Sequence, residues 1–451
     1  MRLAVGRLFG KPEPLAAPGL HHFRPGGGLR GRRVHLRVEC DGSGILVIDA
    51  SKILHLNATA CEFAWLYLAG STPAEAVKTL AGRYRISRSA LQADWEEFQR
   101  TLECLLADEP VCPVTFLGLE RIEPFRTPVS APYRADLAVT YRCNVDCSHC
   151  YNEKKRAGKE LDTESWRRIL GRLWDAGIPH VAFTGGEATL REDLSELVLH
   201  AESLGMVSGL LTNGVRLADA GYLAELDDAG LDYVQVTLES RDPSVHDAMT
   251  GADSHAATVQ ALRNCLARGI YTITNTTITE ANRDTLEATV DFVAELGLEA
   301  MAFNSVIRSG RAAKGGFGLA PADLKLLLER LRGRAMQRGV RLIWYSPTRY
   351  CELDPVELGL GPKRCTAGQY NICIEPDGTV LPCQSYYRSA GNILEDSWTD
   401  IYDCGLMRSL RERDWVEAAC RSCGEFDLCG GGCPLDAAGE SVSCPDMLSN
   451  P

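Results

Sequence analysis

The stretch from Asp136 to Tyr151 carries the residues with the clearest chemistry. It reads DLAVTYRCNVDCSHCY, so Cys143, Cys147 and Cys150 come directly after the alternating pattern of a strand. Thiolates are soft ligands that select iron–sulfur clusters, zinc or copper. A four-iron cubane is usually held by four cysteines, so three thiolates leave one iron for another ligand. The spacing therefore favours a cluster with an open coordination position.

Two simpler interpretations of these cysteines stay open at this point. At this spacing they would share one face of a helix, where they would pack as small core residues. Asn144, Asp146 and Ser148 favour a loop instead. A zinc site usually has a second cysteine pair or histidines, which this stretch lacks.

The C-x3-C-x2-C spacing after a first strand resembles the signature of the radical S-adenosylmethionine (SAM) superfamily. The resemblance implies a [4Fe–4S] cluster on the three cysteines, with the amino and carboxylate groups of SAM on the open iron. An aromatic residue often precedes the third cysteine in that family. Here the position is His149, which the resemblance places among the SAM contacts.

A second motif, Thr184-Gly185-Gly186-Glu187, lies one helix and one strand further on. Glycines allow close approach of the backbone to a ligand, and a carboxylate can pair with an ammonium group. The stretch resembles the family motif that holds the SAM amino group, with Ala188 in place of the usual proline. By position, the resemblance adds these SAM contacts at later strand ends: Thr212, Thr237, Glu239 and Asn275. Arg308 and Arg311 are either further contacts or structural residues.

Between Asp136 and about Tyr345, short apolar runs alternate with amphipathic segments. Strands are predicted at 181–184, 207–211, 233–238, 272–276 and 301–306, and helices at 163–176, 194–204 and 285–296. Repeated strand–helix units imply parallel strands with right-handed crossovers. The predicted class is α/β, and the units fit the partial (β/α)6 barrel of radical SAM enzymes. In such sheets ligands bind at the carboxyl ends of the strands.

The last hundred residues hold a second group of cysteines. Its members are Cys365, Cys383, Cys420, Cys423, Cys429, Cys433 and Cys444. C-x2-C pairs are also common in zinc ribbons. The order and spacing closely resemble the SPASM extension, which carries two auxiliary [4Fe–4S] clusters, so three clusters are expected in all. The resemblance assigns Cys420, Cys423, Cys429 and Cys444 to one auxiliary cluster.

The other auxiliary cluster would take Cys365, Cys383 and Cys433, which leaves its fourth position open. We predict that Cys351 fills it, because Pro355, Gly359 and Gly361 indicate a loop able to fold back. Cys373 is the alternative, although it lies in an alternating, strand-like run.

The first hundred residues predict a smaller domain of another kind. Alternating runs from Arg33 to Leu56 indicate short strands, and three amphipathic helices follow, with Asn57 and Pro73 at two of their starts. This winged-helix-like pattern is similar to the RiPP recognition element, which binds leader peptides by adding a strand to a sheet edge. The expected division of the chain is a flexible extension at 1–21, this domain at 22–108, a proline-rich linker at 109–132, the barrel at 133–345 and the SPASM domain at 346–451.

Composition limits the remaining choices. Acidic residues outnumber basic ones by 60 to 48, which argues against general nucleic-acid binding. No apolar run approaches membrane-spanning length, and the first residues are unlike a signal peptide. Eighteen cysteines without an export signal indicate metal binding in a reducing cytoplasm.

The combined resemblance implies a radical SAM enzyme that modifies a ribosomally made precursor peptide bound through its leader. The product would be a thioether, a carbon–carbon or carbon–oxygen cross-link, or an excised residue. A reduced flavodoxin or ferredoxin-type protein would supply electrons. The alternatives are a maturase of a folded protein, as in formylglycine formation, a tetrapyrrole-modifying enzyme, and a non-catalytic iron–sulfur electron carrier.

Overall fold

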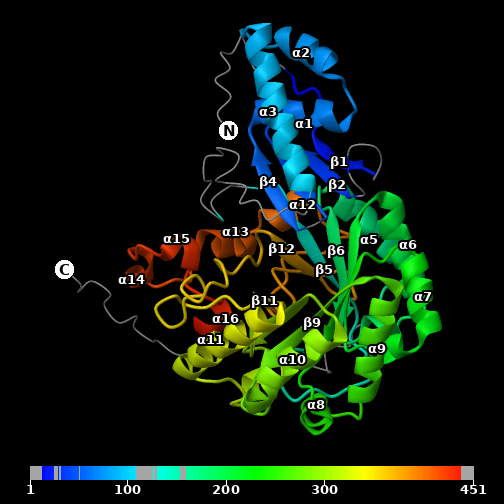
Figure 1. The fold of residues 1–451 in the computed structure, drawn as a ribbon, viewed down its shortest axis with the longest axis vertical. Helices are drawn as coiled ribbons and strands as arrows, with labels where there is room; N and C mark the ends of the chain where they lie inside the picture. Colours follow the sequence, from blue (N-terminus) through cyan, green and yellow to red (C-terminus); the bar gives the residue numbers. More distant parts are fainter. Residues whose placement is uncertain are drawn as a thin grey trace. The chain divides into compact units, whose positions relative to one another are not determined.

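A computed structural model describes residues 13–24, 29, 32–49, 51–107, 125, 129–152 and 159–437. The chain forms two compact units (Figure 1). The N-terminal unit comprises residues 1–123 and 173–180, and the C-terminal unit comprises residues 124–172 and 181–451. In the described residues, no helix combines the length and the apolar character needed to cross a bilayer.

The N-terminal unit has an antiparallel sheet whose strands follow one another in space as in sequence. They are β1 (Gly19–Phe23), β2 (Val34–Val38), β3 (Gly44–Ile48) and β4 (Lys52–Leu56). The helices α1 (Ala58–Leu68), α2 (Pro73–Ala81) and α3 (Arg88–Leu106) come next. Both central strands are fully buried, so the core lies between the sheet and the helices.

Local sequence signals explain where these helices begin. The Asn57 side chain accepts a hydrogen bond from the Ala60 amide at 2.9 Å, and Pro73 occupies the first turn of α2, as predicted. Thr72 and Glu75 complete a reciprocal capping box at the same helix. The winged-helix-like prediction of strands followed by three helices is therefore confirmed in outline.

One boundary prediction is wrong. The segment 1–21 was expected to be a flexible extension, but β1 begins at Gly19 and pairs with β2. Its Leu20 and His21 lack the apolar alternation of the other strands, so the pattern did not reveal them. Most of the predicted linker at 109–132 lies outside the described residues, as do Cys112 and Cys444.

The C-terminal unit is built on a nine-stranded sheet with the order β11-β10-β9-β8-β7-β6-β5-β12-β13. Strands β5 to β11 are Arg134–Thr140, His180–Gly185, Val207–Thr212, Tyr233–Thr237, Tyr271–Ile278, Ala300–Ser305 and Arg341–Trp344. The pairs with a resolved register from β7 to β11 are all parallel. Each strand predicted from the sequence is present, and the α/β class with a partial barrel is confirmed.

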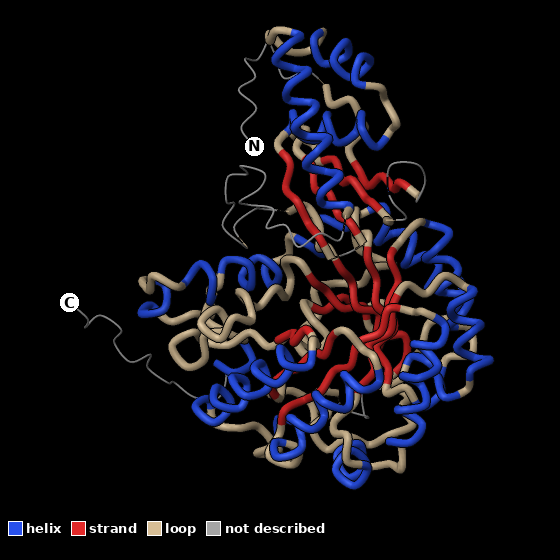
Figure 2. Tube along the Cα trace, viewed as in Figure 1, coloured by secondary structure: helices blue, strands red, loops and turns tan. Residues whose placement is uncertain are grey.

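Helices connect these strands and lie outside them (Figure 2). Their bounds are α5 (Thr163–Asp175), α6 (Leu194–Leu204), α7 (Ala220–Asp228), α8 (Pro243–Thr250), α9 (His255–Arg268), α10 (Leu286–Leu296) and α11 (Pro321–Arg338). The carboxyl ends of neighbouring parallel strands meet at one edge of the sheet, where the polar motifs follow.

The region after Trp344 extends the same sheet. Strand β12 (Asn371–Ile374) pairs in parallel with β5, and β13 (Val380–Leu381) pairs antiparallel with β12. Short helices follow: α12 (Trp398–Tyr402), α13 (Gly405–Glu412), α14 (Ala418–Arg421), α15 (Phe426–Cys429) and α16 (Pro434–Ala437). Because β12 belongs to the barrel sheet, the predicted boundary at residue 345 does not separate two compact units.

Candidate active site

The three-cysteine segment is a loop at the carboxyl end of β5. The Asp146 amide donates to the Thr250 carbonyl at 2.7 Å, and the Ser148 amide donates to the Met249 carbonyl at 3.1 Å. These bonds hold the segment, which includes a turn at residues 148–149, against the end of α8. The alternative of three core cysteines on one helix face is therefore wrong.

The loop brings the three thiols together. Burial raises the pKa of Cys143 and of Cys147, and the neighbouring Cys150 raises both further. Three thiols within electrostatic reach of one another in one partly buried loop suit a thiophilic metal centre, whose positive charge would favour the thiolate forms. The chemistry of these donors therefore fits the predicted cluster, and the assignment of Cys143, Cys147 and Cys150 as its ligands stays a prediction.

The Gly185-Gly186 pair lies against the backbone that leads into this loop. The Gly186 amide donates to the Thr140 carbonyl, and the Glu187 amide donates to the Arg142 carbonyl, each at 2.8 Å. A methyl group at Gly185 would collide with the Thr140 carbonyl oxygen, and Gly185 has φ +134°. The glycines thus allow a close approach to the backbone at the end of β5 and at Tyr141 and Arg142, while their predicted approach to a ligand stays a prediction.

Glu187 is the centre of a buried hydrogen-bond network. Its carboxylate accepts from the Thr189 and Thr212 hydroxyls, both at 2.7 Å, and from the Asn213 amide at 2.8 Å. Burial raises the pKa of Glu187, while these bonds oppose the rise. Thr212, predicted as a SAM contact, orients Glu187 here.

Asn213 connects this network to the cluster loop, because its side-chain amide donates to the Asn144 side chain at 2.7 Å. The sequence indicated Asn144 only as a loop-favouring residue and Asn213 only as part of a turn, and it did not predict their contact. Asn213 belongs to the Thr212-Asn213-Gly214 turn. The turn could be recognised from the sequence, but its contact with Asn144 is visible only in the structure.

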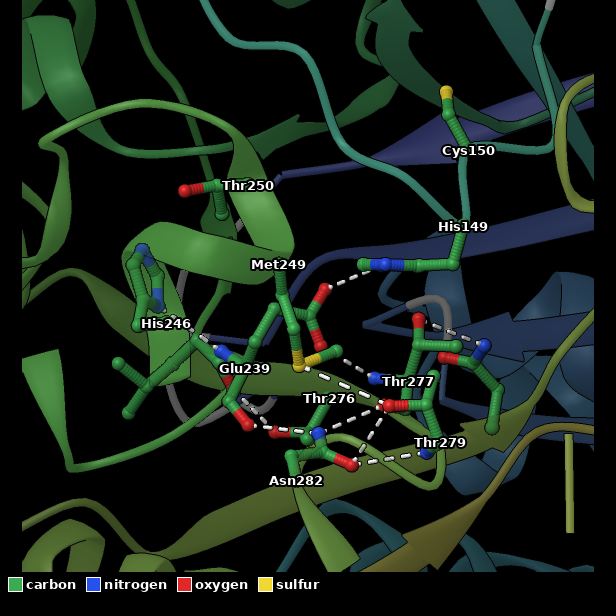
Figure 3. A network of polar contacts seen from close by, with 12 residues as sticks. His149, Cys150, Glu239, His246, Met249, Thr250, Thr276, Thr277, Thr279 and Asn282 are labelled. Atoms are coloured by element: carbon green, nitrogen blue, oxygen red, sulfur yellow. Dashed lines mark hydrogen bonds and ion pairs between the residues drawn. The ribbon is translucent and has the colours of Figure 1, made fainter. Parts of the chain in front are cut away.

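A second network joins His149 to the end of β8 (Figure 3). Glu239 is buried, with one carboxylate oxygen 2.9 Å from His149 Nε2 and the other accepting from the Thr277 amide at 2.9 Å. The Glu239 amide donates to His246 Nδ1 at 3.2 Å. Burial lowers the pKa of His149, but the charge and hydrogen bond of Glu239 outweigh burial and raise it overall.

Asn275 and Thr237 lie beside one another at the same edge of the sheet. They are register partners on β9 and β8, and the buried Asn275 Oδ1 has no hydrogen-bond partner among the described residues. A buried polar atom without a partner is unusual, and a bound ligand is one way to satisfy it. Both positions therefore suit the predicted SAM contact.

The two arginines after β10 have different surroundings. Arg311 pairs with Asp146 of the cluster loop, and the next amide, that of Ala312, donates to the Cys150 carbonyl at 3.1 Å. Arg308 instead lies within electrostatic reach of Asp436. In this structure Arg311 supports the cluster loop.

Of the two cysteine sets expected from the sequence, one shows mutual proximity in the described part of the chain. Cys365, Cys383 and Cys433 influence one another electrostatically, which brings together residues from three separate segments. Cys420, Cys423 and Cys429 follow one another through the turns of α14 and α15, while Cys444 lies outside the described residues. The assignment of these cysteines to individual clusters stays a prediction.

Cys351 and Cys373 also have defined positions. Cys373 is fully buried in β12, as expected of a strand residue, and lies within electrostatic reach of Cys383. Cys351 lies in a turn after Tyr350, whose amide is 3.4 Å from Cys429 Sγ.

Comparison with known proteins agrees with this geometry. Residues 137–293 match the Radical SAM superfamily, and residues 365–424 match the SPASM iron–sulfur cluster-binding domain. The chain is 30% identical over 322 residues to the PqqA peptide cyclase of Streptomyces rochei, a match covering 68% of this chain and 86% of that protein.

Solved structures with the same fold are also found. SuiB of Streptococcus suis, bound to the precursor peptide SuiA, matches with TM-score 0.68 and 18% identity over 90% of this chain and 96% of that chain. The enzyme anSMEcpe with bound AdoMet and the Cp18Cys peptide matches with TM-score 0.54 and 21% identity over 70% of this chain and 92% of that chain. Because the cysteine loop, the buried Glu187 and the family matches coincide, the chain belongs to the radical SAM superfamily and is a radical SAM enzyme with a SPASM domain, which implies [4Fe–4S] clusters and SAM as cofactors.

Proposed function

We propose that this enzyme modifies a ribosomally made precursor peptide and holds the leader segment of that peptide on its N-terminal unit. The observation that carries the proposal is a sheet edge, β4, with an apolar pocket beside it. These two features together suit an extended peptide with an apolar side chain.

Strand β4 is the last strand of its sheet and pairs with β3 among the described strands. The outer side of an edge strand presents backbone N–H and C=O groups that a peptide can bind by adding a strand. Ile53, the second residue of β4, is 37% exposed. An edge strand with an exposed apolar side chain invites pairing with another chain, so a bound peptide gives this edge a function.

A small apolar gap between the sheet and α3, lined mostly by core residues, is the second feature of the proposed site. It is formed by strand and α1 residues on one side and by α3 on the other, and its lining comprises Leu46, Leu54, Leu56, Ala60, Phe98, Thr101, Leu102 and Leu105. Seven of these eight side chains are apolar. Backbone pairing at an edge gives affinity, whereas a pocket for an alternate side chain gives specificity. We therefore assign the predicted domain at 22–108, enlarged by β1, as the leader-binding domain.

The comparisons support this proposal in two ways. The relative from Streptomyces rochei is described as a peptide cyclase, and SuiB was crystallised with a precursor peptide. The SuiB match leaves out only a tenth of this chain, which is much less than the 123 residues that precede the C-terminal unit. The shared fold therefore extends into the leader-binding domain.

The chemistry follows from the residues of the C-terminal unit. With its cluster and SAM bound, a radical SAM site supplies a 5′-deoxyadenosyl radical that removes a hydrogen atom from the substrate. The chain's own residues would position these groups: the three cysteines would hold the cluster, and Glu187, His149, Glu239, Thr237 and Asn275 would surround SAM. We further propose a reduced flavodoxin or ferredoxin-type protein as the electron donor.

The test first identifies a short open reading frame beside this gene and uses the encoded peptide, synthesised with a fluorescent label. Thr101→Trp fills the pocket, and Ile53→Lys places a charge on the exposed edge. We expect each variant to bind the peptide at least tenfold more weakly, while 5′-deoxyadenosine formation without peptide stays at the wild-type level. Mass spectrometry of the peptide after turnover identifies the bond that is made.

Leu326→Lys is the matched control, because Leu326 is an exposed leucine (59%) on α11 of the C-terminal unit. It should bind the peptide as the wild type does. Unchanged peptide binding by both pocket and edge variants would exclude the leader site. Tight binding without any mass change in the peptide would instead exclude the maturase activity.

A further inference from the structure

Two arginines, Arg364 and Arg413, are buried where the segments that carry the auxiliary cysteines meet. Their exposed fractions are 9% and 3%. Arg364 precedes Cys365 in the chain, and Arg413 donates from Nη2 to the Cys365 carbonyl. Arg364 is therefore bonded to Cys365 along the chain and Arg413 through a hydrogen bond, and Cys365 is a predicted ligand of the cluster on Cys365, Cys383 and Cys433.

The same two side chains reach the segment of the other cysteine set. Arg364 Nη1 donates to the Asp427 carbonyl at 2.9 Å, and Arg413 Nη1 donates to the Gly430 carbonyl at 3.4 Å. Gly430 lies between Cys429 and Cys433, which the resemblance assigns to different clusters. It has φ +62°, and a methyl group added there would lie 2.7 Å from Arg364 Nε. The glycine therefore allows the backbone to pass directly over the guanidinium group.

Neither guanidinium has a carboxylate within 4 Å among the described residues, and their hydrogen-bond acceptors there are backbone carbonyls. Each Nε also lacks a hydrogen-bond partner in the described part of the chain. Arg364 and Arg413 repel one another electrostatically. The Asp427 carboxylate attracts Arg364 from beyond ion-pair distance, but no described carboxylate pairs directly with either guanidinium. Two buried like charges without a direct ion pair are costly, so a further anionic group is expected nearby.

The nearby cysteines indicate that the anionic group is an iron–sulfur cluster. Arg413 lies within electrostatic reach of Cys365, Cys429 and Cys433, which represent both auxiliary sets. A cubane held by cysteinates carries net negative charge, and each added electron makes it more negative. Nearby positive charge therefore favours the reduced form, because net charge and hydrogen bonding set the reduction potential of such clusters.

We propose that Arg364 and Arg413 form a permanent cationic bridge between the two auxiliary clusters and raise the reduction potentials of both. The bridge makes the clusters better acceptors of a single electron, with no proton or bond transferred in the reduction step itself. The inference rests on the cluster ligands and holds whatever the enzyme's substrate is.

The test measures the potentials of the auxiliary clusters directly. Full-length protein with Cys143, Cys147 and Cys150 replaced by alanine is reconstituted with iron and sulfide, so that only auxiliary clusters give EPR signals during a dithionite redox titration. Arg413→Gln and Arg364→Gln remove one charge each. We expect each to lower the equilibrium constant for reduction at least tenfold, which is about 59 mV for a one-electron couple.

Two further variants separate charge from structure. Arg413→Lys keeps the charge and should retain the wild-type potentials, even though it loses the forked hydrogen bonds. Arg411→Gln is the matched control, because Arg411 also donates to two backbone carbonyls but is paired with Asp403 at 2.8 Å. It should leave the potentials unchanged.

The outcomes decide the proposal even if a variant assembles poorly. Should Arg413→Gln lose its auxiliary iron while Arg413→Lys keeps both the iron and the potentials, the charge requirement is supported. Iron-loaded glutamine variants with wild-type potentials would overturn the proposal. Equal shifts in Arg413→Lys and Arg413→Gln would overturn it as well, because hydrogen bonding rather than charge would then be responsible.

Discussion

His149 Nε2 lies 2.9 Å from Glu239 Oε1, which ties the residue before the third cluster cysteine to the end of β8. Glu239 also accepts from the amide of Thr277, near the carboxyl end of β9. One buried carboxylate thus joins the cluster loop to two strands that we propose contact SAM. This connection makes His149 part of the positioning of Glu239 in addition to its own predicted contact.

Replacing His149 tests this relationship. His149→Phe restores the aromatic type common in the family but leaves one oxygen of a buried carboxylate without its partner, whereas His149→Gln can still donate. A hydrogen bond to a charged group contributes about 1.5–3 kcal/mol, so we expect His149→Phe to bind SAM about tenfold more weakly. Equilibrium SAM binding by the reconstituted enzyme measures the effect. Equal affinity of the Phe and Gln variants would show that the pair does not organise the SAM site.

The two glycines before Glu187 give a second prediction. Gly185→Ala should weaken SAM binding severely, because its added methyl meets the Thr140 carbonyl oxygen and its φ of +134° strains any other residue. Gly333→Ala is the control, since Gly333 lies inside α11 with nothing within 4 Å of the added methyl. That variant should raise the free energy of unfolding by about 0.5–1 kcal/mol. Thermal unfolding and SAM titration of both variants check the contrast, and wild-type SAM affinity in Gly185→Ala would contradict the close-approach argument.

These contacts also show how far the sequence could predict the structure. The strands from β6 to β10 and the start of α1 at Asn57 depend on patterns within a few residues, so they were predictable. The pairing of β12 with β5 joins segments more than two hundred residues apart, and no local pattern indicates it.

The candidate site shows the same limit. The types and spacing of the three cysteines and of Gly185-Gly186-Glu187 predicted the chemistry, because each motif is contiguous. The partners of those residues were not predictable. Thr212, at the end of β7, contacts Glu187, which follows the neighbouring strand β6. Arg311, which follows β10, pairs with Asp146, which follows β5. Nothing in the sequence indicated that Arg364 and Arg413 are buried. Their burial without a direct ion pair depends on neighbouring groups that no local pattern reveals.

The cluster cysteines give a third prediction. Replacing Cys143, Cys147 and Cys150 together with alanine should abolish 5′-deoxyadenosine formation and remove about four iron atoms per chain. The auxiliary iron should remain, because its ligands belong to other segments. Iron analysis together with chromatography of the SAM products measures both effects. Substantial SAM cleavage by the triple variant would remove these cysteines from the catalytic centre.

The fourth prediction concerns the last ligand of the cluster on Cys365, Cys383 and Cys433. The loop that carries Cys351 folds back onto both cysteine sets: the Gly432 backbone, next to Cys433, packs on Arg349, and the Tyr350 amide contacts Sγ of Cys429, which is assigned to the other cluster, at 3.4 Å. Cys373 lies near Cys383 but is enclosed by Ala138, Tyr141 and Leu381, a setting that suits an unligated thiol. We therefore predict that Cys351, rather than Cys373, completes the cluster.

Mössbauer and EPR spectra of Cys351→Ala and Cys373→Ala, recorded without peptide, distinguish the two. Cys351→Ala should change the auxiliary signals, because one iron exchanges its thiolate for a solvent ligand, while Cys373→Ala should leave them as they are. Cys404→Ser is the control, since that thiol accepts from the Met407 amide at the start of α13. A change confined to Cys373→Ala would transfer the assignment to β12. If neither variant alters the spectra, one iron of this cluster is open to substrate, and direct ligation of the peptide becomes the better account of how the auxiliary cluster acts.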